Sequence, residues 1–178
     1  FRQCSCELLY KIPKKAHRIN RTESIIFRPF KNADAEKICD MYNSSVINHF
    51  RPSLLKNKEE FKEEIFYGLS SSYELKYVME DISAKIPLAY FSITTYDNIN
   101  YTVSVDVQDG YNVDYSLIFG FINRELRRRK RDFNLFVKVS KYIKDNERLE
   151  EYLKRKDGTC ISTQLVLVKD FYKLVKEP

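Results

Sequence analysis

The order of its periodic segments constrains this chain more than any other feature, because few folds accommodate a given succession of strands and helices. Apolar residues alternate with polar ones in several short segments, as in half-buried strands, and follow helical spacing in others. After an N-terminal strand at 4–12, we predict the order β-α-α-β-β-β-α-β-α-β. The strands are expected at 25–29, 73–80, 86–96, 101–107, 133–139 and 160–168, and the helices at 32–46, 57–69, 113–129 and 145–158.

Polar residues indicate where the helices begin. Asn32 is expected to cap the first helix, Asn57 with Glu60 has the pattern of a capping box, and Asp145 is expected to cap the last helix. Consecutive strands pair as a meander, whereas the strand, helix and strand at 101–139 require a parallel crossover. The sequence therefore predicts a mixed sheet with helices on both faces.

The N-terminal strand carries a regular apolar row and is followed by a basic, polar stretch. The row consists of Cys4, Cys6, Leu8, Tyr10 and Ile12. Such a row would invite aggregation if it were exposed. We expect it to pair antiparallel with the strand at 160–168, or to pack on a partner subunit or a preceding domain. Residues 1–24 are thus interpreted as a strand and linker, and 25–178 as the main domain.

The composition excludes several classes of protein. Hydrophobic residues make up 43% and charged residues 31% of the chain, which favours a packed core over disorder. No apolar run approaches the roughly 20 residues that span a bilayer, and no signal-peptide pattern is present. The cysteines include no C-x-x-C pair, and the two histidines are far apart. We therefore expect a cytoplasmic protein with no membrane segment and no metal.

The charge is basic, at +6, which favours acidic partners such as CoA phosphates or nucleic acid. Much of the excess lies at 11–21 and in the run from Arg127 to Arg131. Arginines form bidentate contacts with phosphates, but cations also complement the negative end of a helix. No nucleic-acid-binding motif accompanies the run, so we do not expect nucleic acid as the partner. A module that binds a polyanion is therefore the least favoured of three hypotheses, and the other two rest on different residues.

The segment from Ile26 to Pro29, followed by Asp34-Ala35-Glu36 and Ile38, resembles the opening of GNAT (GCN5-related N-acetyltransferase) domains. The likeness spans about residues 25–168. The phrase at 167–174 is similar to the end of GNAT domains in tandem or fused proteins. The resemblance implies an α/β (α+β) fold with a mixed, mostly antiparallel central sheet. It also implies transfer of an acetyl or acyl group from acetyl-CoA or another acyl-CoA to an amine.

GNAT enzymes hold the CoA pyrophosphate on backbone N–H groups within a Gln/Arg-x-x-Gly-x-Gly/Ala loop. By resemblance, the candidate cofactor-binding residues here are Val107, Gln108, Gly110, Asn112 and, from the later helix motif, Asn146. The loop departs from the pattern because it contains one glycine only.

Two acids close to this loop, Asp109 and Asp114, would also repel a pyrophosphate. The sequence therefore predicts a degenerate loop that binds acyl-CoA weakly.

The resemblance also suggests catalytic residues. Asp106 lies on the polar side of the strand at 101–107, where GNAT enzymes often carry the general base, and Glu80 and Asp81 are alternatives. Tyr152 is the candidate general acid, one position before the tyrosine of the pattern Asn-x-x-Ala-x-x-x-Tyr-x-x-x-Gly-Phe. The alternatives are a solvated acid for Asp106 and a packing aromatic for Tyr152.

Two further interpretations stay open beside the polyanion-binding module. The first is an N-acyltransferase that acts on an amine-bearing small molecule or protein. The second is a non-catalytic GNAT-like interaction or scaffold domain, beside a partner domain or in a homodimer. The second needs no cofactor.

Overall fold

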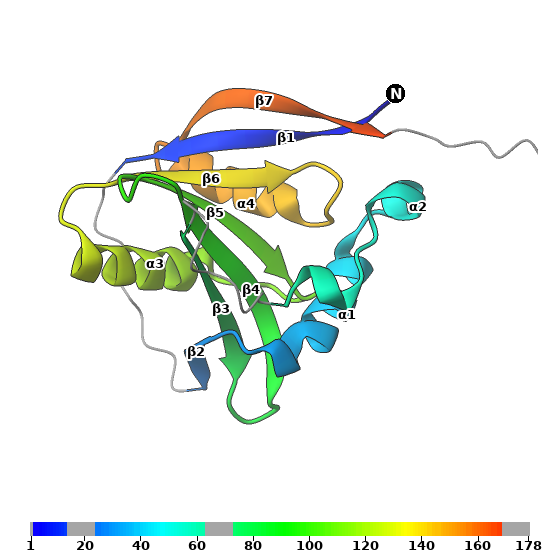
Figure 1. Cartoon of the computed structure of the whole chain (residues 1–178), viewed down its shortest axis with the longest axis horizontal. Coiled ribbons are helices and arrows are strands. Elements are labelled where there is room, and N and C mark those ends of the chain that lie inside the picture. The colour runs from blue at the N-terminus through cyan, green and yellow to red at the C-terminus, as the bar shows by residue number, and fades with distance from the viewer. Residues whose placement is uncertain (1, 14–23, 63–72, 169–178) are drawn as a thin grey trace, which may run out of the picture.

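The computed structural model describes residues 2–13, 24–62 and 73–168. They contain one seven-stranded sheet of order β2-β3-β4-β5-β6-β1-β7 (Figure 1). The strands are β1 (Arg2–Ile12), β2 (Ile25–Pro29), β3 (Tyr73–Asp81), β4 (Ile86–Thr95), β5 (Asn100–Val107), β6 (Asn134–Ser140) and β7 (Thr159–Val168). All neighbouring strands pair antiparallel except β5 and β6, which are parallel. The predicted mixed, mostly antiparallel sheet is confirmed.

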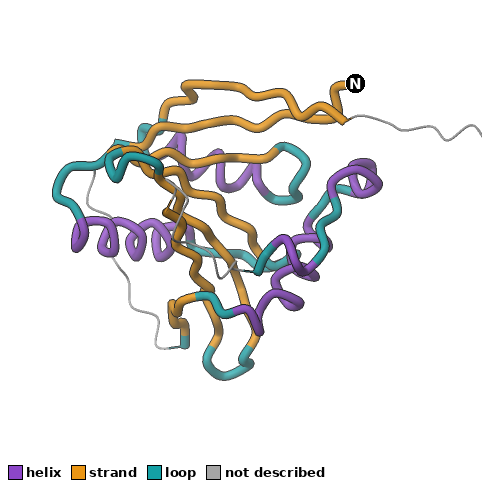
Figure 2. The backbone as a smooth tube through the Cα atoms, in the orientation of Figure 1, coloured by secondary structure: helices purple, strands orange, loops and turns teal. Residues whose placement is uncertain are grey.

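Helices lie on both faces of this sheet (Figure 2). They are α1 (Ala35–Ser45), α2 (Arg51–Leu54), α3 (Tyr115–Arg129) and α4 (Asn146–Arg155), with short 3-10 turns at Asn32–Asp34, Asn48–Phe50 and Lys58–Glu60. Apolar side chains of α3 and α4, such as Ile118 and Leu149, pack with Phe91 and Val103 of the sheet. On the opposite face, Ile38 and other residues of α1 form a second core. No helix of the described segments is long and apolar enough to cross a membrane.

The helix starts differ in part from the predictions. Asn32 is the first residue of a 3-10 turn and not the N-cap of α1, and in this turn the Asp34 carboxylate accepts a hydrogen bond from the Lys31 N–H at 2.9 Å. The capping box of Asn57 and Glu60 is confirmed, although it begins a 3-10 turn, and the helix predicted beyond it lies largely outside the described residues.

The starts of α3 and α4 also differ in part from the predicted caps. Asp145 occupies the predicted N-cap position of α4, but it adopts a left-handed backbone with φ 59° and its side chain makes no capping hydrogen bond. Asp114, which the sequence did not single out as a cap, accepts from the Ser116 N–H at 2.9 Å and starts α3. Asx side chains bond to several nearby N–H groups, and the backbone decides which one is reached.

The N-terminal strand lies inside the sheet. β1 pairs antiparallel with β7, as predicted, and also with β6, so that Leu8 has Val139 on one side and Thr163 on the other. Tyr10 is buried and its hydroxyl donates to Glu150 of α4 at 2.7 Å. Because β1 joins β6 to β7, Leu8, Tyr10 and Ile12 of its apolar row add to the core on the α4 face.

The parallel pair β5–β6 is the feature that shapes a site. Their pairing runs from Asn100 with Asn134 to Ser104 with Lys138 and then stops, although both strands continue. Figure 1 shows the two strands together at one end and diverging toward their C-terminal ends. The predicted parallel neighbours, joined by α3, are therefore confirmed, and they are splayed.

Candidate functional site

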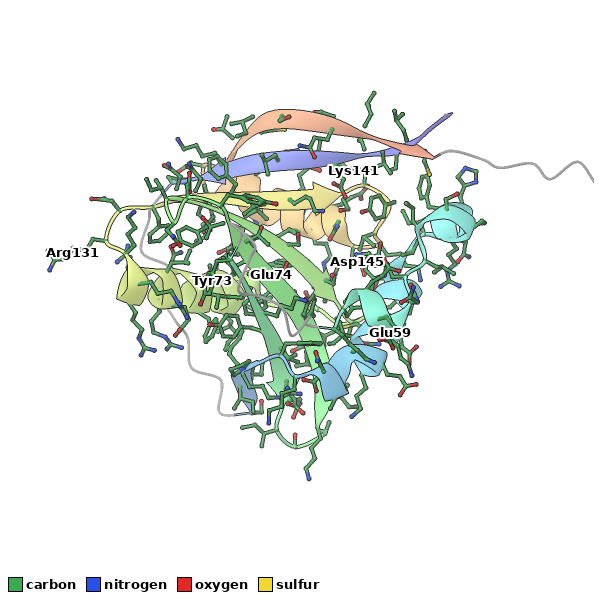
Figure 3. The ribbon with its side chains drawn as sticks, viewed as in Figure 1. Glu59, Tyr73, Glu74, Arg131, Lys141 and Asp145 are labelled. Atoms are coloured by element: carbon green, nitrogen blue, oxygen red, sulfur yellow. The ribbon has the colours of Figure 1, made fainter. Side chains whose placement is uncertain are left out.

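A cavity of about 350 Å³ lies over the sheet on the α1 side, next to the splay between β5 and β6. Four strands form its floor and the α1–β3 connection forms part of its wall. Its polar lining residues include Lys56, Lys76, Ser92, Ser104, Asp106, Lys138, Ser140 and Tyr142. In Figure 3, Glu74 of β3, which also lines the cavity, lies over the middle of the sheet.

The alternation of β5 explains why polar groups face this cavity. Val103 and Val105 point into the core beneath α3, so the residues that alternate with them along the strand face the opposite side. There Ser104 and Asp106 line the cavity. One strand therefore supplies both a core face and a site face.

Asp106 is the central group of the site. Its half-buried carboxylate has no hydrogen bond or ion pair with any residue in the described part of the chain. Burial raises the pKa of this carboxyl group from 3.8 to about 6, although the charges of Lys56 and Lys138 act in the opposite direction. A carboxylate with this pKa, facing a cavity, is a typical proton acceptor.

A hydrogen-bonded cluster holds the wall next to Asp106. The Tyr142 hydroxyl donates to Glu7 of β1 at 2.6 Å, the Ser140 hydroxyl donates to the same oxygen at 3.1 Å, and Lys138 lies 3.5 Å from it. Burial alone would raise the pKa of Glu7, but the hydrogen bond from Tyr142 and the charge of Lys138 lower it. Burial and the bond to Glu7 raise the pKa of Tyr142. Glu7 is therefore held ionised by its neighbours.

Glu80, the alternative base, does not line the cavity. Its carboxylate lies 2.5 Å from Arg28, which also binds Asp34 through two hydrogen bonds of 2.7 and 2.9 Å. Burial alone would raise the pKa of Asp34, but Arg28 lowers it. The other alternative, Asp81, accepts hydrogen bonds from Ser83 in the turn after β3. These acids therefore make structural contacts at the β2–β3 edge of the sheet and in the turn after β3.

Tyr152 also does not line the cavity. It lies in the core on the α3 and α4 side, where its ring stacks on Phe119 with centroids 5.4 Å apart. Burial, mainly, raises the pKa of its hydroxyl. The structure therefore does not bring Tyr152 to Asp106.

Three backbone N–H groups of the loop from Val107 to Val113 already donate within the protein. The N–H of Gln108 bonds to Leu88 of β4 at 2.9 Å, that of Tyr111 to Gln108 at 3.0 Å, and that of Val113 to Tyr111 at 3.2 Å. Gly110 has the φ of 77° that glycine accommodates readily.

Side chains also tie this loop to its neighbours. Lys144 binds Asp109 at 2.6 Å, Arg148 donates to Asn112, and the Ser45 hydroxyl lies 2.9 Å from the carbonyl oxygen of Val107.

These contacts test whether the loop fits a CoA pyrophosphate. A pyrophosphate site needs backbone N–H groups that are free to point at the anion, and the N–H groups of Gln108, Tyr111 and Val113 are bonded within the protein. Asp109 adds a carboxylate to the same loop. In this conformation the loop does not fit the group. Asn146 faces the cavity, but its side-chain amide donates to the Ser140 carbonyl at 2.9 Å.

Two other kinds of site considered from the sequence are a metal site and a polyanion-binding site at the basic run around the end of α3. The described segments contain no group of three or more His, Cys, Asp or Glu side chains that could hold a metal ion. In the basic run, Arg128 pairs with Glu125 at 3.0 Å and Arg129 donates to the Tyr73 hydroxyl at 2.7 Å. Figure 3 shows Arg131 beyond the end of α3, far from the cavity.

The sequence did not identify most of the cavity wall. Lys56 lies far from Lys138 and Tyr142 in the chain, and only the strand register and the return of the α1–β3 connection bring it to them. The usable signal was a polar residue at alternating positions of β3, β4, β5 and β6.

Comparison with known proteins identifies the fold. No family model matches the sequence, and no curated protein matches it. Among solved structures, a probable N-acyltransferase from Enterococcus faecalis V583 has a TM-score of 0.62 at 11% identity, covering 92% of this chain and 38% of that one. A tandem GNAT protein from the clavulanic acid biosynthesis pathway has a TM-score of 0.60 at 6% identity, covering 90% and 52%.

A shorter protein matches over most of its length. The PaiA N-acetyltransferase from Thermoplasma acidophilum, in complex with coenzyme A, has a TM-score of 0.56 at 14% identity, covering 74% and 88%. The chain spans only 39%, 60% and 52% of the first three structures that it matches. At these identities the comparisons show the fold alone.

Proposed function

We propose that this chain, which has the GNAT fold, is an N-acyltransferase that acylates an amine bound in the cavity over β3 to β6, with Asp106 as the proton acceptor. The observation that carries the proposal is the Asp106 carboxylate, which lines a cavity beside the splay of β5 and β6 and has no partner among the described residues. A partly buried carboxylate without a partner lowers the stability of the fold, and such groups occur most often at functional sites.

The chemistry requires a group of this kind. An aliphatic amine is protonated at neutral pH, with a pKa of about 10, and an ammonium has no lone pair with which to attack an acyl carbon. The N–C bond forms as the bond between the acyl carbon and its carrier breaks, and the carrier leaves with that electron pair. The amine proton passes to Asp106, whose pKa of about 6 keeps it mostly ionised at neutral pH yet more basic than an ordinary aspartate.

The acyl donor that the fold suggests is acyl-CoA, and the loop from Gln108 to Val113 opposes tight binding of it. That same loop favours a second candidate function, a non-catalytic GNAT-like interaction domain.

One pair of measurements separates the two functions. In a calorimetric titration we expect acetyl-CoA to bind more weakly than 1 μM, a threshold of about −8 kcal/mol. At millimolar acetyl-CoA we expect thiol release that depends on added amine and is lost in Asp106→Asn. Sub-micromolar binding would contradict our interpretation of the loop, and no amine-dependent release from the folded protein would leave the non-catalytic function.

A further inference from the structure

The floor of the cavity is a row of cross-strand partners. Lys76 of β3 is paired with Ser92 of β4, Ser92 with Ser104 of β5, and Ser104 with Lys138 of β6. Cross-strand partners present their side chains on the same face of a sheet. Two small hydroxyl residues therefore lie between two lysines, and Asp106 is two residues beyond Ser104 on the same face.

The two lysines of this row are already neutralised. Lys76 is buried, lies 3.4 Å from Glu74 and donates to the Phe61 carbonyl at 3.1 Å. Lys138 lies 3.5 Å from Glu7. A ligand on this floor thus meets lysines whose local charge is balanced.

Of the remaining charges of the cavity, the Glu60 carboxylate accepts a hydrogen bond from the Asn57 N–H at 2.9 Å. Two others have neither an ion pair nor a hydrogen bond among the residues that the structure describes, and they have opposite signs. One is the carboxylate of Asp106. The other is the ammonium of Lys56, which lies exposed at the cavity wall, 4.4 Å from the ring centroid of Tyr42 and 5.3 Å from that of Phe61. Lys56 and Asp106 influence one another through the cavity but form no ion pair.

We propose that the ligand of this cavity is an amine that also carries a carboxylate, that is, a free amino acid, with its ammonium group facing Asp106 and its carboxylate facing Lys56. The proposal rests on the proposed function, because it names the acceptor class of the same site. Each end of such a zwitterion meets the unpaired charge of opposite sign, and the seryl hydroxyls of the floor offer further hydrogen bonds. The cavity of about 350 Å³ is large enough for a molecule of this size.

The same charges select against other amines. A polyamine bound at Asp106 places its second cation toward Lys56, whose charge has no ion partner among the described residues, and like charges repel there. A simple alkylamine satisfies Asp106 but leaves Lys56 without a partner.

Binding measurements on the whole chain test this inference without relying on turnover. The ligands are two matched sets, 4-aminobutyrate with butylamine and 1,4-diaminobutane, and alanine with alaninamide. Each is titrated by calorimetry or by NMR, with and without 1 mM coenzyme A. We expect the carboxylate-bearing member of at least one set to bind about tenfold more tightly than its partners.

Lys56→Gln should remove this preference, by about fivefold to tenfold, because it deletes the charge that faces the carboxylate. Lys58→Gln is the matched control, since Lys58 is an exposed lysine two residues further along that does not line the cavity. Asp106→Asn should weaken the binding of every amine, with or without a carboxylate.

The outcomes separate this inference from the proposed function. Equal or tighter binding of butylamine or 1,4-diaminobutane would overturn the amino-acid assignment, even if those amines were acylated. Binding of amino acids that is lost in Lys56→Gln, without any thiol release, would support the ligand class and refute the transferase. A preference that survives Lys56→Gln would show that Lys56 is not the carboxylate partner and would overturn the proposed orientation.

Discussion

Replacement of Asp106 by asparagine tests the site through stability as well as activity. In the folded protein the pKa of Asp106 is raised from 3.8 to about 6 by burial. A raised pKa means that the folded state holds the acid proton more tightly than the unfolded chain does. Stability therefore falls as the pH rises from about 4 to about 6 and stays at the lower level above that range.

The size of the effect follows from the two pKa values. One pKa unit corresponds to about 1.4 kcal/mol, so a rise from 3.8 to about 6 costs at most about 3 kcal/mol at neutral pH. Asp106 is half-buried and faces a cavity, which reduces the cost. We expect Asp106→Asn to raise the free energy of unfolding by about 1 to 3 kcal/mol at pH 7.5 and to leave it nearly unchanged at pH 4.

Urea unfolding followed by circular dichroism, at pH 4 and at pH 7.5, measures this difference. Asp40→Asn is the matched control, because Asp40 is an exposed aspartate of α1 and should give no pH-dependent gain. The same Asp106 variant should lose amine-dependent thiol release. A variant that is less stable than the parent at pH 7.5 would falsify the reasoning, because it would mean that the carboxylate stabilises the fold and is not an unpaired functional group.

Three further changes test residues outside the cavity. Deletion of residues 1–13 should abolish the cooperative thermal transition, since it removes the strand between β6 and β7; melting within a degree or two of the parent would show that β1 is dispensable. Tyr152→Phe should keep thiol release, because Tyr152 does not line the cavity and its ring stacks on Phe119; a large loss of release from a stable variant would instead support Tyr152 as the general acid. Glu80→Gln should lower stability by about 1 kcal/mol through its bond to Arg28 while leaving ligand binding intact, and weakened binding would contradict its placement outside the site.

The fold was predictable because its elements have strong periodic patterns. The alternation of Val103 and Val105 identifies a strand with one apolar face, and the strand, helix and strand that follow allow a parallel pair in one sheet. The insertion of β1 between β6 and β7 was predicted only in part. Apolar alternation identifies the face that is buried, but it does not determine which strands lie on either side.

The site was less predictable, because pairing register and not local sequence assembles it. Asp106 could be singled out as a polar residue on a strand of the expected fold. The row of Lys76, Ser92, Ser104 and Lys138 exists only when four strands are aligned to the residue, and a shift by one residue would turn each of them to the opposite face. Read one strand at a time, such residues are indistinguishable from an ordinary solvated face.

The N-terminal strand takes part in the site through its polar face. Leu8, Tyr10 and Ile12 face the α4 side, whereas Glu7 faces the cavity side, where it binds Ser140, Tyr142 and Lys138. If Glu7 were removed, Lys138 would lose the carboxylate that lies 3.5 Å from it and would be left as a second unpaired cation beside Lys56. The selection that we infer, an amine at Asp106 and a carboxylate at Lys56, therefore depends on β1: it neutralises Lys138 and leaves one cation of the wall free to recognise an anionic group.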